Sequence, residues 1–350
     1  MKFFLFLISF QFSFQTLILP LTKTQSNTFS IPLCIGKPYQ CTDFILSQLE
    51  SDIKLYITKD IAMKDSTTKF LIYTEGNITL YTDYLYFNDN VQLKNVYITN
   101  IETYSRNNYI GLNRKRNDEL PFDLLQMSLI EKLYRIAEGK RVFYIDMVNS
   151  NLFIGAYPYE YYNKYNKTSP LQVKQCKRES YNGTYYNCKM SMIYFKKGKL
   201  YKYYQINENY AIFDIGTNAI YVSKEFFDFL IENYFSEQIK EQKCEVAQWS
   251  QYHFIKCEED YNYIKDKRLG PIAFVIGKYT LKINPINLFS AFISKSTFFL
   301  MLYVETKRPW TFGYPLFNKY TVIFDDDKDI ISFIPKYILF LLDVKLAYYK

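Results

Sequence analysis

The sequence contains very little histidine, since His253 is the single one among 350 residues. One imidazole cannot build a His-rich metal site, and it argues against catalysis by a Ser–His or Cys–His pair. The net charge is +8, yet lysine and arginine are scattered and form no sustained basic stripe. A nucleic-acid interface normally shows such a stripe. We therefore expect no metal, no cofactor and no nucleic-acid partner.

Long apolar runs are confined to the N-terminus. Lys2 is followed by no charged residue until Lys23, and most of the intervening residues are apolar. This pattern predicts a secretory signal peptide over residues 1–24. An uncleaved signal anchor is the alternative, although polar residues interrupt the apolar part. No later segment approaches the roughly 20 apolar residues of a membrane span, so we expect no transmembrane helix beyond the signal.

The six cysteines fall into three near pairs. An even cysteine count behind a signal peptide indicates disulfides, for which fifteen pairings are formally possible. Local pairing is favoured because each near pair closes a short loop between strand-like segments. The predicted bonds are Cys34–Cys41, Cys176–Cys188 and Cys244–Cys257.

Three N-x-Ser/Thr sequons, at Asn77, Asn166 and Asn182, are candidate glycosylation sites. Such sites are used on surface loops of secreted proteins. Together with the signal and the cysteines, they predict the secretory pathway, with an extracellular or lumenal destination that includes a vacuole or lysosome.

The chain after the signal is predicted to be all-β. Residues 28–112 form short segments rich in Ile, Leu, Tyr, Phe and Thr with turn residues between them, which is typical of antiparallel strands. One helix is expected over 121–138, where apolar residues recur with helical spacing. A polar stretch at 163–170 separates an N-terminal lobe (28–165) from a C-terminal lobe (166–350).

The stretch 210–222 carries the strongest candidate for chemistry. An apolar strand runs into Asp214, a turn follows, and a second apolar strand leaves it. Gly216 permits a tight backbone at the turn. A turn aspartate usually caps its own loop, but an aspartate between two buried strands is costly unless it is hydrogen-bonded.

Over about residues 30–335 the chain resembles the pepsin-like aspartic endopeptidases. The opening strand with its I-G-x-P-x-Q turn, the flap hairpin, the second-lobe D-T-G-T loop, the W-x-L-G segment and the closing V-F-D strand are similar to 31–40, 73–78, 211–222, 310–320 and 322–333, respectively. The resemblance implies a bilobal acid-protease fold with two β-barrel-like lobes around an interlobe cleft. It also implies a monomer that holds a peptide or protein ligand in that cleft.

The resemblance assigns roles to four residues. Asp214 matches the second-lobe catalytic aspartate, Gly216 and Thr217 support its loop, and Tyr73 matches the flap tyrosine. In this class two aspartates about 3 Å apart share one proton. One deprotonates a water molecule while the other protonates the peptide carbonyl oxygen.

The first lobe lacks the matching aspartate. If Leu55–Ile57 is aligned with the family's L-W-V, the D-T-G positions fall on Leu49, Glu50 and Ser51. A further departure is Ile215, which stands where the family has Thr or Ser. These differences predict a secreted homologue that is catalytically inactive and keeps a peptide-binding cleft.

Two alternatives remain open at this point. The chain is an active aspartic-type endopeptidase if Glu50 or Asp52 is recruited beside Asp214, although catalysis tolerates little misplacement. Alternatively, it is a non-catalytic surface or structural glycoprotein that makes contacts through its aromatic exterior or through the apolar tail over 336–350.

Overall fold

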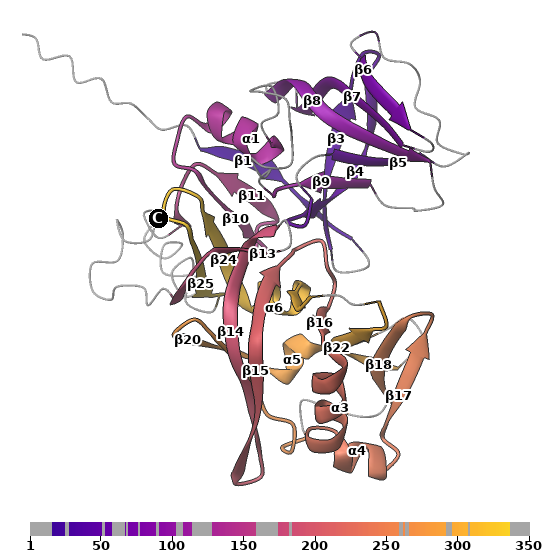
Figure 1. The fold of residues 1–350 in the computed structure, drawn as a ribbon, viewed down its shortest axis with the longest axis vertical. Coiled ribbons are helices and arrows are strands. Elements are labelled where there is room, and N and C mark those ends of the chain that lie inside the picture. The colour runs from indigo at the N-terminus through magenta and orange to yellow at the C-terminus, as the bar shows by residue number, and fades with distance from the viewer. Residues whose placement is uncertain are drawn as a thin grey trace, which may run out of the picture.

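The structure is a computed structural model, and it is described here for most of the chain. The described residues are 16–24, 28–50, 53–57, 67, 69–75, 78–88, 91–102, 108–113, 128–158, 174–181, 184–258, 262, 266–291, 296–306 and 309–336. They form three β-sheets with a few short helices (Figure 1). The all-β prediction is therefore confirmed.

The first lobe contains one eight-stranded sheet with strand order β2-β3-β4-β9-β5-β8-β7-β6. Its strands are β2 (Thr22–Lys23), β3 (Phe29–Ile35), β4 (Gln40–Ser47), β5 (Ile53–Ile57), β6 (Phe70–Glu75), β7 (Ile78–Asn88), β8 (Val91–Glu102) and β9 (Asn108–Gly111). An additional pairing of β3 with β7 curls this sheet toward a barrel.

The second lobe contains an eleven-stranded sheet along the path β17-β18-β22-β16-β23-β15-β14-β19-β20, with β13 and β21 attached to its members. The strands are β13 (Glu179–Tyr181), β14 (Thr184–Lys197), β15 (Leu200–Phe213), β16 (Ile220–Val222), β17 (Cys244–Trp249), β18 (Tyr252–Cys257), β19 (Ile272–Ile276), β20 (Tyr279–Ile283), β21 (Phe289–Ala291), β22 (Thr297–Val304) and β23 (Thr311–Phe312).

A six-stranded sheet joins the two lobes. Its order is β1-β11-β10-β24-β25-β12, and it lies between the lobes in Figure 1. The strands are β1 (Leu17–Pro20), β10 (Val142–Asp146), β11 (Asn151–Ile154), β12 (Lys174–Lys177), β24 (Tyr320–Asp325) and β25 (Ile330–Pro335). Both halves of the chain contribute three strands, so the shared sheet ties the lobes into one unit.

Short helices accompany the sheets, and two of them begin at a serine cap. The helices are α1 (Leu129–Ala137), α3 (Lys224–Asn233), α4 (Ser236–Lys240), α5 (Pro285–Leu288) and α6 (Tyr314–Lys319). A helix was predicted over 121–138, and α1 (Leu129–Ala137) is the part of it that lies within the described residues. Ser128 and Glu131 form a capping box at its start. The Ser223 hydroxyl accepts a hydrogen bond from the Phe226 N–H at the start of α3. None of the helices within the described ranges is long and apolar enough to cross a membrane.

All three predicted disulfides are present: Cys34–Cys41, Cys176–Cys188 and Cys244–Cys257. The first and third bonds each link directly opposed residues of an antiparallel pair, β3 with β4 and β17 with β18. The second connects the shared sheet to the second lobe, because Cys176 lies in β12 and Cys188 in β14. Such cross-links typically contribute about 2–4 kcal/mol each.

The C-terminal boundary of the predicted signal peptide needs correction. Strand β1 pairs with β11 in the shared sheet, and β2 pairs with β3. Leu17, Leu19 and Leu21 are buried in the main hydrophobic core. Residues 17–23 are therefore part of the fold, and the N-terminal lobe does not start at residue 28. Leu17, Leu19 and Leu21 alternate as in a buried strand, and because they are apolar they were included in the predicted signal peptide.

Several sequence predictions concern residues outside the described ranges. They are the sequons at Asn77, Asn166 and Asn182, the lobe boundary at 163–170, Ser51 and Asp52 in the first-lobe loop, and the tail after Lys336.

We predict that Leu19→Ala lowers the free energy of unfolding by about 2–5 kcal/mol, because it empties a fully buried site. The matched control is Ile18→Ala on the same strand, where the side chain is 48% exposed and the change should be small. Urea unfolding of both variants measures the difference. Equal stability of the two variants would show that β1 does not contribute to the core.

Candidate functional site

Asp214 lies directly after β15, at the point where the second lobe faces the first. Strand β15 pairs in parallel with β23, and β23 pairs antiparallel with β16. The Asp214 N–H donates to the Phe312 carbonyl at 3.0 Å, and the Thr217 N–H donates to the Asp214 carbonyl at 3.2 Å. Three strands and a closed turn thus fix the aspartate, whose residue exposure is only 2%.

The first lobe repeats this arrangement of strands. Strand β4 pairs in parallel with β9, and β9 pairs antiparallel with β5. In the second lobe Phe213 lies opposite Phe312, and in the first lobe Leu46 lies opposite Ile110. The residue that follows Leu46 is therefore the counterpart of Asp214, and it is Ser47.

The return strands give the same correspondence. Ile53 pairs with Ile110, and Ile220 pairs with Phe312. Ile53 comes six residues after Ser47, and Ile220 comes six residues after Asp214. The two loops thus have equal length, and each turns around the same position of its middle strand.

The register predicted for the first loop is therefore shifted by two residues. Ser47, Gln48 and Leu49 occupy the places of Asp214, Ile215 and Gly216, whereas the sequence alignment had started the loop at Leu49. The cause is the period of a β-strand. Side chains alternate between faces, so Ile53–Leu55 and Leu55–Ile57 present the same apolar pattern. A slip of two residues leaves that pattern unchanged.

The residues predicted from the sequence to form the first-lobe loop, Leu49 and Glu50, make contacts within the first lobe. The Leu49 N–H donates to Ser47 Oγ at 3.1 Å. Glu50 Oε2 forms an ion pair with Lys54 Nζ at 2.6 Å, within the first lobe. Neither residue supplies a hydrogen bond or a charge to Asp214. Ser51 and Asp52 are outside the described residues.

The Asp214 carboxylate accepts hydrogen bonds from both lobes. Its Oδ1 accepts from the Gln48 N–H at 2.9 Å and from the Gly216 N–H at 3.2 Å. Its Oδ2 accepts from Thr217 Oγ1 at 2.7 Å. The Ser47 side chain also lowers the pKa of this carboxyl. Gly216 and Thr217 thus support the aspartate as the sequence indicated, and two unanticipated residues, Ser47 and Gln48, join them.

A reciprocal hydrogen bond runs between the two loops. Gln48 Oε1 accepts from the Ile215 N–H at 2.6 Å. Ile215 has no hydroxyl to make such a link, and a glutamine from the first loop reaches its backbone amide instead. Gln48 Nε2 is buried and lacks a hydrogen-bond partner within the described residues. Leaving such a donor unsatisfied costs about 1–3 kcal/mol. The glutamine therefore gains one hydrogen bond to Ile215 and loses stability through its unpaired Nε2.

Gly216 is required at this junction for steric reasons. A Cβ atom on this residue would lie 2.5 Å from the Leu46 carbonyl oxygen and 3.3 Å from Ser47 Cβ. The second-lobe turn therefore packs against the end of β4 with no room for a side chain. This close approach explains why a glycine stands here even though the first loop has Leu49 at the corresponding place.

Burial raises the pKa of the Asp214 carboxyl above its ordinary value of 3.8, and the hydrogen bonds from Thr217, Gln48, Gly216 and Ser47 offset part of that rise. Because the folded pKa is raised, the contribution of Asp214 to stability is fully present below its unfolded pKa. That contribution is lost as the pH rises through the folded pKa. Among the residues that the structure describes, no second carboxylate shifts this pKa.

Two other residues named from the sequence have clear positions. Tyr73 lies on β6 of the flap-like hairpin, opposite Leu80 of β7. His253 lies on β18, where Nε2 is 2.9 Å from Glu305 Oε1 and the ring stacks on Tyr303. The histidine is thus a surface strand residue.

The fold is that of a bilobal aspartic proteinase. The chain is similar to the crystal structure of an aspartic proteinase from Irpex lacteus, with a TM-score of 0.63, over 91% of this chain and 97% of that one. Sequence identity is only 11%, so this likeness concerns the fold. No protein-family model matches the sequence, and neither does any curated protein.

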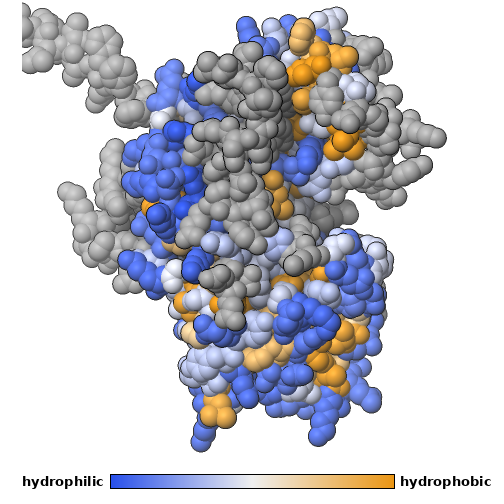
Figure 2. Space-filling view, in the orientation of Figure 1, coloured by the Kyte–Doolittle hydropathy of each residue, from blue (hydrophilic) through white to orange (hydrophobic). Residues whose placement is uncertain are grey.

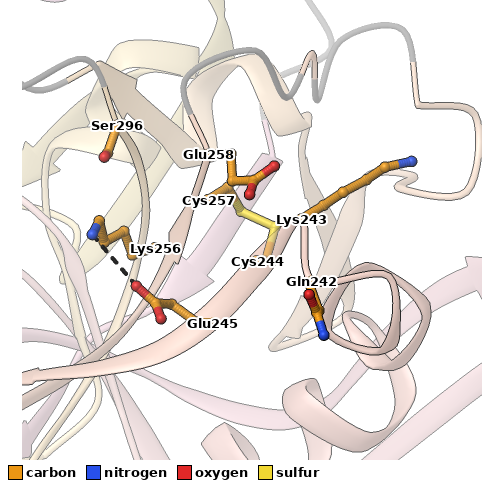
Figure 3. A pocket seen from close by; sticks show the side chains of 8 residues that line it. All are labelled: Gln242, Lys243, Cys244, Glu245, Lys256, Cys257, Glu258 and Ser296. Carbon is orange, nitrogen blue, oxygen red and sulfur yellow. Dashed lines mark ion pairs between the residues drawn. A yellow bond between two sulfur atoms is a disulfide. The ribbon is translucent and has the colours of Figure 1, made fainter.

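A polar hollow of about 660 Å³ lies at a different place, beside the Cys244–Cys257 disulfide (Figure 3). An ion pair of 3.4 Å between Lys256 and Glu245 spans part of it. Its other lining residues are Gln242, Lys243, Glu258 and Ser296. None of them belongs to the Asp214 or Ser47 loop, so the hollow is separate from the site described above.

We predict that Gln48→Ala destabilises the protein, because the buried Ile215 N–H loses its acceptor at a cost of about 1–3 kcal/mol, which relief of the unpaired Gln48 Nε2 offsets only in part. The matched control is Gln248→Ala, since Gln248 is exposed and bonds only to surface groups. Chemical denaturation of both variants measures the loss. A Gln48 variant as stable as the Gln248 variant would contradict a role for Gln48 in joining the loops.

Proposed function

We propose that the chain is a secreted homologue of the aspartic proteinases that does not hydrolyse peptides and uses its interlobe cleft to bind a peptide or protein segment. One observation carries this proposal: Ser47 takes the pseudo-symmetric place of Asp214. A serine hydroxyl has no acidity near physiological pH, so it cannot share a proton with the remaining carboxylate.

The surroundings of Asp214 support the same conclusion. Proton sharing requires two carboxyl groups that cannot both ionise. Asp214 instead meets hydrogen-bond donors from Gln48, Gly216 and Thr217. Donors on both oxygens make it an acceptor that links the two loops.

An active peptidase that recruits a different acid is the main competitor. Glu50 corresponds to Thr217 in the repeated frame and is paired with Lys54 at 2.6 Å. By count along the sequence, Asp52 comes five residues after Ser47, as Ala219 comes five residues after Asp214. Neither position corresponds to Asp214, so the repeated geometry favours a non-hydrolytic protein.

The proposed location follows from covalent chemistry. Three disulfides form and persist in oxidising compartments, and this chain has all six cysteines paired. We infer passage through the secretory pathway, a monomeric state and glycans on the sequons. A non-catalytic surface glycoprotein would share these properties and would differ in having no ligand in its cleft.

We predict no cleavage of denatured casein at acid pH and no effect of pepstatin, because one carboxylate cannot form the shared-proton pair. The assay compares the purified protein with its Asp214→Asn variant, and both should match a blank. Cleavage by the unmodified protein that disappears in Asp214→Asn would contradict the proposal.

A gain-of-function variant tests whether the sequence of the first loop is the reason why the protein does not hydrolyse peptides. Ser47→Asp combined with Gln48→Thr and Leu49→Gly installs the D-T-G sequence in the corrected register. We expect acid-pH cleavage to emerge in this variant and to be abolished by adding Asp214→Asn. The same three residues installed at 49–51 serve as the matched control and should give no cleavage.

A further inference from the structure

The hairpin of β14 and β15 ends in an exposed tip that combines apolar, aromatic and basic side chains. A two-residue turn, Gly198–Lys199, joins the strands, and Gly198 has a φ of 60°. Leu200 directly after the turn is 69% exposed, and Tyr201 and Tyr203 are 52% and 57% exposed. The hairpin runs to the lower end of the molecule (Figure 1).

The strand register sorts these side chains onto two faces. Tyr194 pairs with Tyr203, and Lys196 pairs with Tyr201. Residues opposed across an antiparallel pair share a face, so the three tyrosines and Lys196 lie together on one side. Their ring centroids are 5.7–6.2 Å apart. The other face, with Phe195, packs against Phe229 and Tyr234 of the α3 region.

The tip is also strongly basic. Between Cys188 and Asn207 the chain carries five lysines and no acid. Lys197 approaches Glu237 of α4 at 3.9 Å. Within the described parts of the chain, no ion pair joins an acid to Lys196, Lys199 or Lys202. Figure 2 shows an apolar spot among hydrophilic residues at this lower end.

We propose that this tip, defined as Tyr194, Lys196 and residues 199–203, docks the protein on a membrane that presents anionic lipids on its extracellular or lumenal side, which is the side that the proposed secretory route reaches. Exposed apolar patches rimmed by polar residues mark interaction sites. Tyrosine is enriched at the membrane–water interface, and clustered lysines are attracted to anionic headgroups. Leu200 pairs with Lys197 and so lies on the face opposite the tyrosines, but it follows the turn directly and is exposed, which suits insertion between headgroups.

Vesicle sedimentation tests this inference with the full-length protein. Phosphatidylcholine vesicles containing phosphatidylserine should bind the protein, and pure phosphatidylcholine vesicles should bind it much more weakly. Lys196→Glu with Lys199→Glu should reduce binding by about tenfold or more, since each lysine near an anionic surface contributes substantially. Equal binding to both vesicle types, or no binding to either, would overturn the proposal.

Lys278→Glu is the matched control, because Gly277–Lys278 is a second exposed Gly–Lys turn in the same lobe, between β19 and β20. It should bind vesicles like the unmodified protein, and an equal loss of binding in Lys278→Glu would overturn the assignment to the tip.

The variant Leu200→Ser distinguishes binding to a bilayer from binding to a soluble polyanion. Reduced vesicle binding supports insertion, whereas unchanged vesicle binding with strong retention on heparin would show a polyanion site and contradict the membrane proposal. Thermal unfolding should be unchanged in all these surface variants.

Discussion

The hydrogen bond from the Gln48 N–H to Asp214 Oδ1 is the contact on which the centre of the molecule depends. A buried carboxylate without donors is strongly unfavourable, so Asp214 can be kept in the interior only if both lobes supply donors to it. The Gln48 N–H donates to it from the first lobe, and the Gly216 N–H and the Thr217 hydroxyl donate from the second. This arrangement explains the tight approach at Gly216 and the depth at which the aspartate lies. The aspartate is therefore hydrogen-bonded to both loops.

The two lobes share a backbone frame but differ in chemistry. In both, a strand ends at the central loop, a middle strand runs parallel to it, and the return strand pairs with the middle one on its other edge. Such a frame fixes where side chains lie and leaves their identity open. Ser47 and Asp214 occupy corresponding positions with very different acidities, which agrees with the general rule that fold does not determine function.

The sequence predicted the β class and all three disulfides, because these depend on alternation and local cysteine spacing, while the bilobal fold was implied by the resemblance to the aspartic endopeptidases. It failed where a strand pattern is ambiguous. The two-residue slip at Leu55 hid the role of Ser47, since alternation repeats every two residues. The buried alternation of Leu17, Leu19 and Leu21 was taken for part of a signal peptide. A comparison of the two strand-to-strand spacings, six residues in each lobe, would have revealed the correct loop register.

The most direct test of the account is a carboxyl-carbon NMR titration of Asp214 in the protein labelled at aspartate. A lone buried carboxylate should titrate in a single step with a midpoint above 3.8, because burial disfavours its ionised form. The resonance is assigned by its absence in Asp214→Asn. Two coupled steps, of which one is far below the ordinary aspartate range, would indicate a shared proton. That result would contradict the central claim that Asp214 has no catalytic partner.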